Sequence, residues 1–338
     1  ILAEIEQDGE VALRRWAEEL GDLERDAPLV VSRQELSKSL DRVTTEQRTV
    51  LERVADRIRQ FAQRQRAALG DVEQAIPGGR VGHRVVPVEV AGCYAPGGRY
   101  PLPSSALMTA VTARAAGVDH VWLASPRPTA ENLAAAAVAG VDGLLAVGGA
   151  QAVAALAYGV GGVQRCDVVV GPGNVWVTAA KKMLVGEVGI DILAGPSELV
   201  ILADESADPS LIAADLLAQA EHDVEALPIL VTPDETIVEE VEQALEEQLA
   251  DLPTARTARV ALSRGCAVLV DDIEQSIEVV NRLAPEHLQI MTREPQAVSS
   301  RCRHFGGLFV GAMTPEVLGD YGAGPNHTLP TGGTARFS

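Results

Sequence analysis

The sequence predicts an α/β protein in which helices cover buried, parallel-rich sheets, preceded by a helical N-terminal region. The chain has 338 residues, which exceeds the usual limit of a single hydrophobic core and favours two domains. Hydrophobic residues make up 47% of the chain and charged residues 22%, a composition typical of globular proteins. Beyond residue 90, short apolar runs alternate with helical segments, which indicates βαβ units with parallel strands.

The N-terminal region, residues 1–70, is heavily charged and has a helical pattern. Its apolar residues recur near a period of 3.6, as at Leu51, Val54 and Ile58, and we interpret the region as a solvated helical hairpin. A Gly/Pro break at residues 76–79 follows. The run 85–90 is rich in valine and has the character of a strand despite its proline.

The remaining elements follow from the alternation of apolar and amphipathic segments. The stretch 133–160 is rich in Ala and Gly and contains Asp142 and Gln151, so it is interpreted as a buried helix, strand and helix rather than a membrane span. Helices are expected at 129–139, 210–221 and 234–249. Strands are expected at 120–124, 143–147, 168–170, 199–203, 229–232, 267–270 and 308–310.

Charge and cysteine usage limit the possible partners. The chain carries 28 basic and 47 acidic residues, a net charge of −19, which disfavours nucleic acid and membrane surfaces and leaves a small molecule as the expected ligand. The four cysteines are far apart and form no CxxC pair. This argues against a disulfide framework and against a thiolate zinc site, and predicts a reducing, cytoplasmic setting.

Two glycine-rich turns are candidates for binding a dinucleotide. The chain has no G-x-G-x-x-G motif, since Gly171 and Gly173 supply only its first two glycines. The turns at 148–151 and 171–174 each follow an apolar strand and open a helix, where backbone N–H groups suit a phosphate. Each turn can also be an ordinary tight connection between a strand and a helix.

Two pairs of polar residues could carry the chemistry. Gln219 and His222 are three residues apart near the end of a helix, so their amide oxygen and imidazole nitrogen could form half of a zinc shell. The alternative is that His222 only interacts with the helix dipole. Glu286 and His287 follow Pro285 at the end of a helix, and such a pair can divide proton transfers between them. The alternative is a surface turn.

The Gly- and Pro-rich stretch 314–330 is polar and long for a structureless connection, which favours a functional loop.

Taken together, the order and spacing of the motifs resemble the histidinol dehydrogenase family across essentially the whole chain. The stretches that carry the resemblance are 91–98, 146–154, 171–174, 194–198, 219–222, 284–288 and 319–330.

The resemblance implies two Rossmann-like domains with an atypical dinucleotide site. One domain would comprise residues 1–93 and 199–338, with the zinc and catalytic residues, and the other, 94–198, would bind NAD. The family oxidises L-histidinol to L-histidine in two hydride transfers to NAD, through bound histidinal. His287 would deprotonate the alcohol and Glu286 would activate water, while zinc orients the substrate's imidazole and amine.

The resemblance implies a role for each remaining site residue. Zinc ligands would be Gln219, His222 and Asp320, NAD contacts Tyr94, Gln151 and Asn174, and substrate contacts Ser197, Glu316 and His327 together with the zinc ligands.

The family's fourth zinc ligand is a histidine in a C-terminal segment that follows the equivalent of residues 336–338 and reaches into the partner of a homodimer. We therefore expect this chain to have low activity and to bind zinc or dimerise weakly. Two other readings stay open: a paralogue that oxidises another small alcohol such as a sulfopropanediol, and a non-catalytic remnant that binds NAD.

Overall fold

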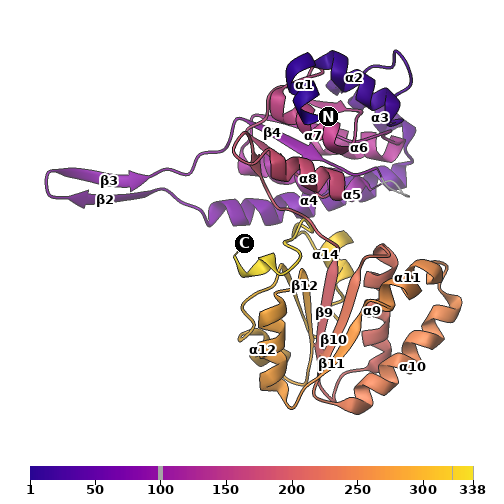
Figure 1. Ribbon diagram of the computed structural model, residues 1–338. Helices are drawn as coiled ribbons and strands as arrows, with labels where there is room; N and C mark the ends of the chain where they lie inside the picture. Colours follow the sequence, from indigo (N-terminus) through magenta and orange to yellow (C-terminus); the bar gives the residue numbers. More distant parts are fainter. Residues whose placement is uncertain (98–101, 322, 338) are drawn as a thin grey trace. The chain divides into compact units, whose positions relative to one another are not determined.

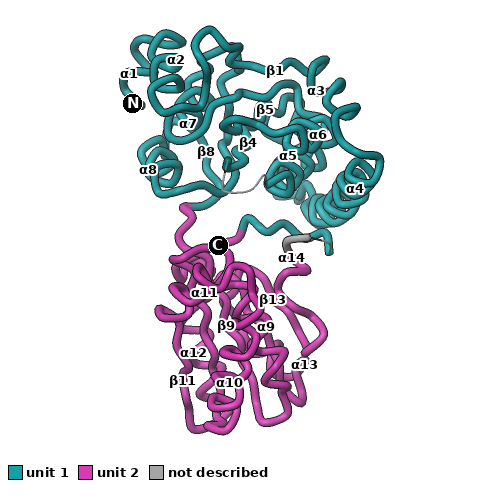
Figure 2. The backbone as a smooth tube through the Cα atoms, turned by 90° about the vertical axis from the view of Figure 1, so that its right-hand side faces the viewer, with its two compact units in different colours: residues 1–192, 321–328 teal, residues 193–320, 329–338 magenta. Residues whose placement is uncertain are grey.

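The computed structural model describes residues 1–97, 102–321 and 323–337, except for the side chains of Asp320 and Tyr321. The chain forms two compact units (Figures 1 and 2), unit 1 with residues 1–192 and 321–328, and unit 2 with residues 193–320 and 329–338. Among the described residues, none of the helices is both long and apolar enough to cross a membrane.

Unit 1 contains a six-stranded sheet in the order β1-β6-β5-β4-β7-β8. Strand β1 is antiparallel to its neighbour β6, and the other pairs are parallel. The strands are β1 (Val30–Ser32), β4 (Val90–Tyr94), β5 (His120–Ala124), β6 (Gly143–Leu145), β7 (Val168–Val170) and β8 (Gly189–Ile190).

Helices cover both faces of this sheet. One face packs against α3 (Arg33–Ser39), α4 (Thr45–Ala67), α5 (Pro103–Ala116) and α6 (Ala130–Ala139), and the other against α1 (Leu2–Asp8), α2 (Glu10–Glu19), α7 (Gly149–Tyr158) and α8 (Val175–Met183). Several of these helices are rich in alanine, and the residues of α7 from Gln151 to Ala157 are all buried. Small side chains let the helix backbone lie close to the sheet.

The N-terminal residues belong to unit 1, which corrects the expected division of the chain. The resemblance implies one domain of residues 1–93 and 199–338, but β1 pairs with β6, and β4 lies between β5 and β7. The expected helical hairpin is instead the series α1 to α4 with the short helix η1 (Leu40–Arg42) and β1. Helix α4 begins at a capping box formed by Thr44 and Gln47.

The segment after α4 also differs from the prediction. The break at 76–79 is the turn of an antiparallel hairpin, β2 (Val72–Ile76) and β3 (Gly79–His83), whose residues are all exposed. The predicted strand at 85–90 is wrong except for Val90, which begins β4. Val86 and Val88 are exposed, and Pro87 has no N–H to donate to a neighbouring strand.

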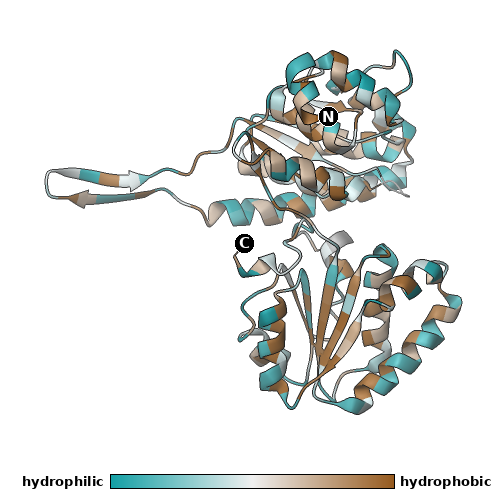
Figure 3. Cartoon of the chain, in the orientation of Figure 1, coloured by the Kyte–Doolittle hydropathy of each residue, from teal (hydrophilic) through white to brown (hydrophobic). Residues whose placement is uncertain are grey.

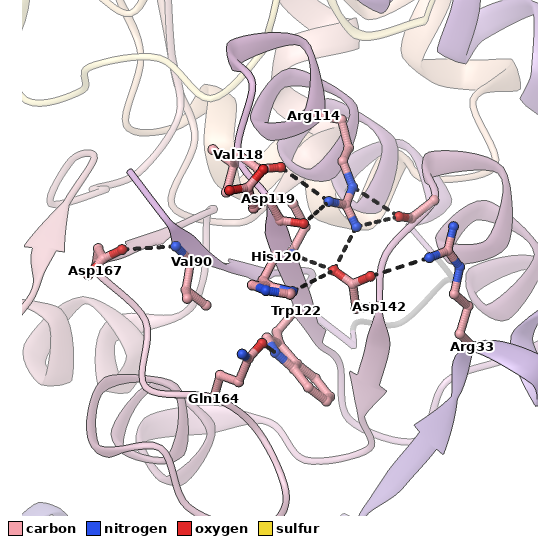
Figure 4. Close-up of polar contacts among 12 residues, drawn as sticks. Arg33, Val90, Arg114, Val118, Asp119, His120, Trp122, Asp142, Gln164 and Asp167 are labelled. Carbon is pink, nitrogen blue, oxygen red and sulfur yellow. Dashed lines mark hydrogen bonds and ion pairs between the residues drawn. The ribbon is translucent and has the colours of Figure 1, made fainter. Parts of the chain in front are cut away.

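The half-buried Arg114 links the helices of unit 1 to the starts of its strands (Figure 4). Arg114, in the last turn of α5, donates hydrogen bonds to the carbonyls of Asp119 and Gly140 and to the Asp142 carboxylate at 2.7 Å. The same Asp142 oxygen accepts the N–H of Val121 in β5. This network fixes where α5 and α6 end relative to the sheet.

Unit 2 contains a five-stranded sheet, all parallel, in the order β11-β10-β9-β12-β13. Figure 3 shows these strands as largely hydrophobic and the helices around them as mixed. The strands are β9 (Glu198–Ala203), β10 (Leu227–Thr232), β11 (Cys266–Leu269), β12 (His287–Met291) and β13 (Gly307–Val310).

Helices cover both faces of the second sheet as well. Helices α9 (Pro209–His222), α10 (Glu235–Asp251) and α11 (Ala255–Leu262) pack on one face, and α12 (Ile273–Leu283) and α13 (Pro295–Ser299) on the other. The short elements α14 (Val317–Tyr321) and η2 (Thr334–Arg336) follow β13. The predicted fold class, α/β with two parallel-rich sheets and a helical N-terminus, is confirmed.

Candidate active site

Glu286 and His287 lie where a helix leads directly into a buried strand. Helix α12 ends at Leu283, and Ala284 adopts a left-handed conformation with φ of 51°. Pro285 and Glu286 then lead into β12, whose first residue is His287. Glu286 is 6% exposed and His287 7%, so the alternative of a surface turn is wrong.

The first residue of β9 contacts both members of this pair. The Nδ1 atom of His287 lies 3.1 Å from the carbonyl oxygen of Glu198. Because a carbonyl oxygen only accepts hydrogen bonds, Nδ1 carries the hydrogen and Nε2 is the basic nitrogen of the ring. The Glu198 N–H donates to Oε2 of Glu286 at 3.0 Å, and His287 Nδ1 lies 3.8 Å from the same carboxylate.

The side chain of Glu198 holds a later segment of unit 2. Its Oε1 accepts the N–H of Gly332 at 3.0 Å, and the N–H of Gly195 donates to Oγ1 of Thr331 at 2.6 Å. Burial raises the pKa of Glu198, and the hydrogen bond from Gly332 opposes that shift. Residues 331–332 are thereby fixed at the start of β9.

These groups lie at the amino edge of the unit 2 sheet. Glu198 pairs with Leu227, the first residue of β10, while His287 pairs with Leu199 and Gly307. Ligands of open α/β sheets more commonly bind beyond the carboxyl ends of the strands. Since α9 connects the parallel strands β9 and β10, it runs back across the sheet and ends at this amino edge.

The same face of the sheet brings His287 toward α9. Side chains alternate along a strand, so His287, Gln289 and Met291 share one face, and Met291 packs in a cluster with α9 residues. Gln289 also donates to the Asp215 carboxylate of α9 at 2.6 Å. Gln219 and His222 follow Asp215 on the same helical face, toward the end of α9 that meets the amino edge.

The described residues fit part of a zinc site. Gln219 is buried and His222 is exposed at the helix C-terminus, where the negative end of the helix dipole favours a cation. Together they offer two of the four donors that a tetrahedral zinc site uses. The side chain of Asp320, in α14, lies outside the described residues. Within the described part, no group of three His, Cys, Asp or Glu side chains could hold a metal.

The predicted substrate contacts fall into both units. Ser197 is half-buried immediately before β9, and its carbonyl accepts the N–H of Leu227 at 2.9 Å. Glu316 is buried just before α14 in unit 2. His327 belongs to unit 1, next to Asn326, whose side chain donates to the carbonyl of Met108 at 2.9 Å.

Sequence reasoning missed the buried pair of Asp215 and Gln289. Gln289 is fully buried, and among the described residues its Oε1 has no hydrogen-bond partner. Burial raises the pKa of Asp215, and the hydrogen bond from Gln289 opposes that shift. The available signal was a polar residue alternating with apolar ones directly after His287.

In unit 1, the first glycine-rich turn is held by a carboxylate from the N-terminal region. Oδ2 of Asp22 accepts the Gly148 N–H and the side-chain amide of Gln151, each at 2.9 Å. The Tyr94 hydroxyl accepts the Gly149 N–H at 3.0 Å, and burial raises its pKa. In this structure the N-terminus of α7, a predicted phosphate position, is therefore already capped by groups of the chain.

The second turn, residues 171–174, carries an exposed Asn174. Its Oδ1 accepts the N–H groups of Trp176 and Val177, which makes it the N-cap of α8. Gly171 has a φ of 120°, and a Cβ there would lie 2.2 Å from the carbonyl oxygen of Tyr94. Tyr94 thus touches both turns, and the structure gathers the three predicted NAD contacts in one region of unit 1.

Comparison with known proteins identifies the family. A sequence model described as histidinol dehydrogenase matches residues 1–338. The chain belongs to the histidinol dehydrogenase family. It is 44% identical over 345 residues to the histidinol dehydrogenase of Pseudomonas fluorescens Pf0-1, covering 100% of this chain and 78% of that one. The Acinetobacter baylyi protein of the same name is 46% identical over 330 residues, covering 96% and 75%.

A solved structure supports the same family assignment. The crystal structure of histidinol dehydrogenase from Elizabethkingia anophelis superposes with a TM-score of 0.93 at 32% identity, covering 99% of this chain and 78% of that one. The resemblance inferred from the motifs is therefore confirmed. As a member of the histidinol dehydrogenase family, the chain is an NAD-dependent oxidoreductase.

Proposed function

We propose that this chain oxidises L-histidinol to L-histidine, the end of histidine biosynthesis, in two successive hydride transfers to NAD. The observation that carries the proposal is the buried pair of Glu286 and His287, oriented by one strand residue, Glu198. A buried, oriented pair of proton acceptors suits alcohol oxidation, because a proton and a hydride must leave the substrate together.

His287 is the base of the first oxidation. Its Nδ1–H is directed at the Glu198 carbonyl, so Nε2 accepts the hydroxyl proton while the carbon-bound hydrogen leaves with its electron pair for the nicotinamide. The product of this step is histidinal, which keeps its carbon skeleton and stays bound.

Glu286 acts in the second oxidation. Its carboxylate accepts a proton from water as the water oxygen attacks the aldehyde carbon, and the resulting hydrate loses the second hydride. The hydrogen bond from the Glu198 N–H fixes one carboxylate oxygen, so the group does not need to reorient between the two steps.

The remaining residues bind and orient. In this proposal Tyr94, Gln151 and Asn174 contact NAD, and Ser197, Glu316 and His327 contact the substrate. Gln219, His222 and Asp320 would hold zinc. The bound zinc would orient the imidazole and the amine of the substrate. The protein would act as a cytoplasmic homodimer.

The test is to assay the purified chain with NAD and zinc on L-histidinol and on a sulfopropanediol, next to His287→Asn. We expect two NADH per L-histidinol, and a loss of about 100-fold or more in His287→Asn with NAD affinity unchanged. Preference for the sulfopropanediol would identify a paralogue. Equal rates for the variant and the parent would contradict the proposed base.

A further inference from the structure

A buried ion pair lies directly behind the second glycine-rich turn and has no part in the chemistry described above. Lys181, on α8, is 2% exposed, and its ammonium contacts the carboxylate of Asp191, which follows β8. Lysine is almost never fully buried unless it is paired. This pair therefore calls for a physical reason.

Both partners bind the backbone of one residue. Nζ of Lys181 donates to the Gly171 carbonyl at 2.9 Å, and Oδ2 of Asp191 accepts the Gly171 N–H at 2.7 Å. The N–H and C=O of Gly171 are thus held by the two members of one ion pair. Gly171 is also the residue whose Cβ would collide with Tyr94, so the ion pair keeps this backbone against that strand.

Stability alone is a weak explanation for such a pair. The free-energy cost of removing two charges from water offsets much of their mutual attraction. Replacing such a pair by apolar residues of similar volume is often neutral or stabilising. The pair does, however, fix the direction in which the chain leaves β7 and reaches Asn174. An apolar pair could fill the space but could not hold both backbone groups of Gly171.

We propose that Lys181 and Asp191 are positioning residues of the cofactor-binding turn, acting through Gly171 on Asn174 and Tyr94. This inference rests on the proposed function, because it takes Tyr94 and Asn174 as NAD contacts. The pair itself does not touch the cofactor.

The experiment compares Lys181→Met, Asp191→Asn and the double variant Lys181→Met/Asp191→Leu with the full chain. Arg165→Met is the matched control, since Arg165 and Glu187 form an exposed ion pair at 3.6 Å in the same unit. Calorimetry gives the Kd for NAD, thermal melting gives Tm, and hydrogen exchange follows the peptide around residues 170–175.

We expect each single variant to lower Tm and to raise the Kd for NAD about tenfold or more. In the double variant Tm should recover, while the NAD affinity stays low and the turn exchanges faster. The KM for L-histidinol should not change in any variant.

A double variant that binds NAD like the parent, with an unchanged exchange rate, would overturn the inference. If the parent itself binds no NAD, the proposed function fails. In that case, faster hydrogen exchange around residues 170–175 in the double variant would still support the inference that the ion pair positions the turn. An unchanged exchange rate would reject that inference.

Discussion

The amide and carbonyl of Glu198 contact the two proposed bases, the Glu286 carboxylate at 3.0 Å and Nδ1 of His287 at 3.1 Å. Both contacts use the backbone of a strand, which is a more rigid support than a loop. The relative placement of the two bases therefore depends on the position of β9. The Glu198 side chain in turn fixes the neighbouring segment through Gly332.

Glu198→Ala should lower kcat about tenfold or more, because the segment around Gly332 loses its anchor next to the bases. Glu198→Gln keeps an oxygen that can accept the Gly332 N–H and should retain most of the activity. Steady-state rates measured across pH give the comparison. If Ala and Gln behave alike, the hydrogen bond to Gly332 has no role in positioning.

Glu286→Gln should separate the two oxidations. The amide cannot accept a proton from water, so aldehyde oxidation should slow by about 100-fold or more while alcohol oxidation continues. Assaying the variant separately with L-histidinol and with histidinal measures each step. Equal losses on both substrates would show that Glu286 does not act selectively on water.

Asp22→Ala should weaken NAD binding although the residue lies far upstream of the predicted contacts. The change leaves the Gly148 N–H and the Gln151 amide without their acceptor, at a cost of about 1–3 kcal/mol. Glu24→Ala, an exposed carboxylate in the same loop, is the control. Calorimetric NAD affinities that are the same for both variants would contradict a role of Asp22 in holding Gln151.

Asp215→Asn should change how stability depends on pH. The raised pKa of Asp215 means that the folded state keeps a proton that the unfolded state has lost. The free energy of unfolding therefore falls as pH rises from the unfolded pKa of about 3.9 through the higher folded value.

An asparagine does not ionise, so this variant should be more stable than the parent at pH 8, and the gain should shrink as the pH falls toward 4. Its Oδ1 can still accept the hydrogen bond from Gln289. Denaturant unfolding at the two pH values measures the difference. A gain of equal size at both would rule out titration of Asp215 as its cause.

Only one cysteine should react rapidly with a thiol reagent in the native protein. Cys266 is exposed, whereas burial raises the pKa of Cys93 to about 12 and also raises the pKa of Cys166 and Cys302. Cys266→Ser should abolish the fast phase of labelling at pH 8. A fast phase that persists in this variant would show that a buried thiol opens readily.

The sequence was most informative where one physical signal was strong. The strands predicted at 120–124 and 168–170 are confirmed with the same bounds, because each is a short, mainly apolar run of the kind that parallel sheets bury. Strand β12 was missed because His287 and Gln289 interrupt its apolar pattern. Those polar residues are buried by tertiary contacts with Glu198 and Asp215, which no local pattern encodes.

The division into units was wrong for a related reason. Strand β4 is central in the first sheet only through pairing with β5 and β7, and β7 is more than 70 residues away in sequence. Periodicity does not report such pairing. The Glu286 and His287 pair was found from residue types alone, but its burial and its link to Glu198 required the fold.

The alanine-rich helices of unit 1 determine which mutations it tolerates. A core built from small side chains has little volume to lose, so trimming its residues creates only small cavities. Enlarging them forces neighbouring atoms apart, and one or two added methyl groups typically cost about 1–3 kcal/mol. Ala154 and Ala155 are both fully buried in α7, so Ala→Val should be the harmful substitution at either position. Among related proteins, we expect the residues at these two positions to be limited by side-chain volume as well as by polarity.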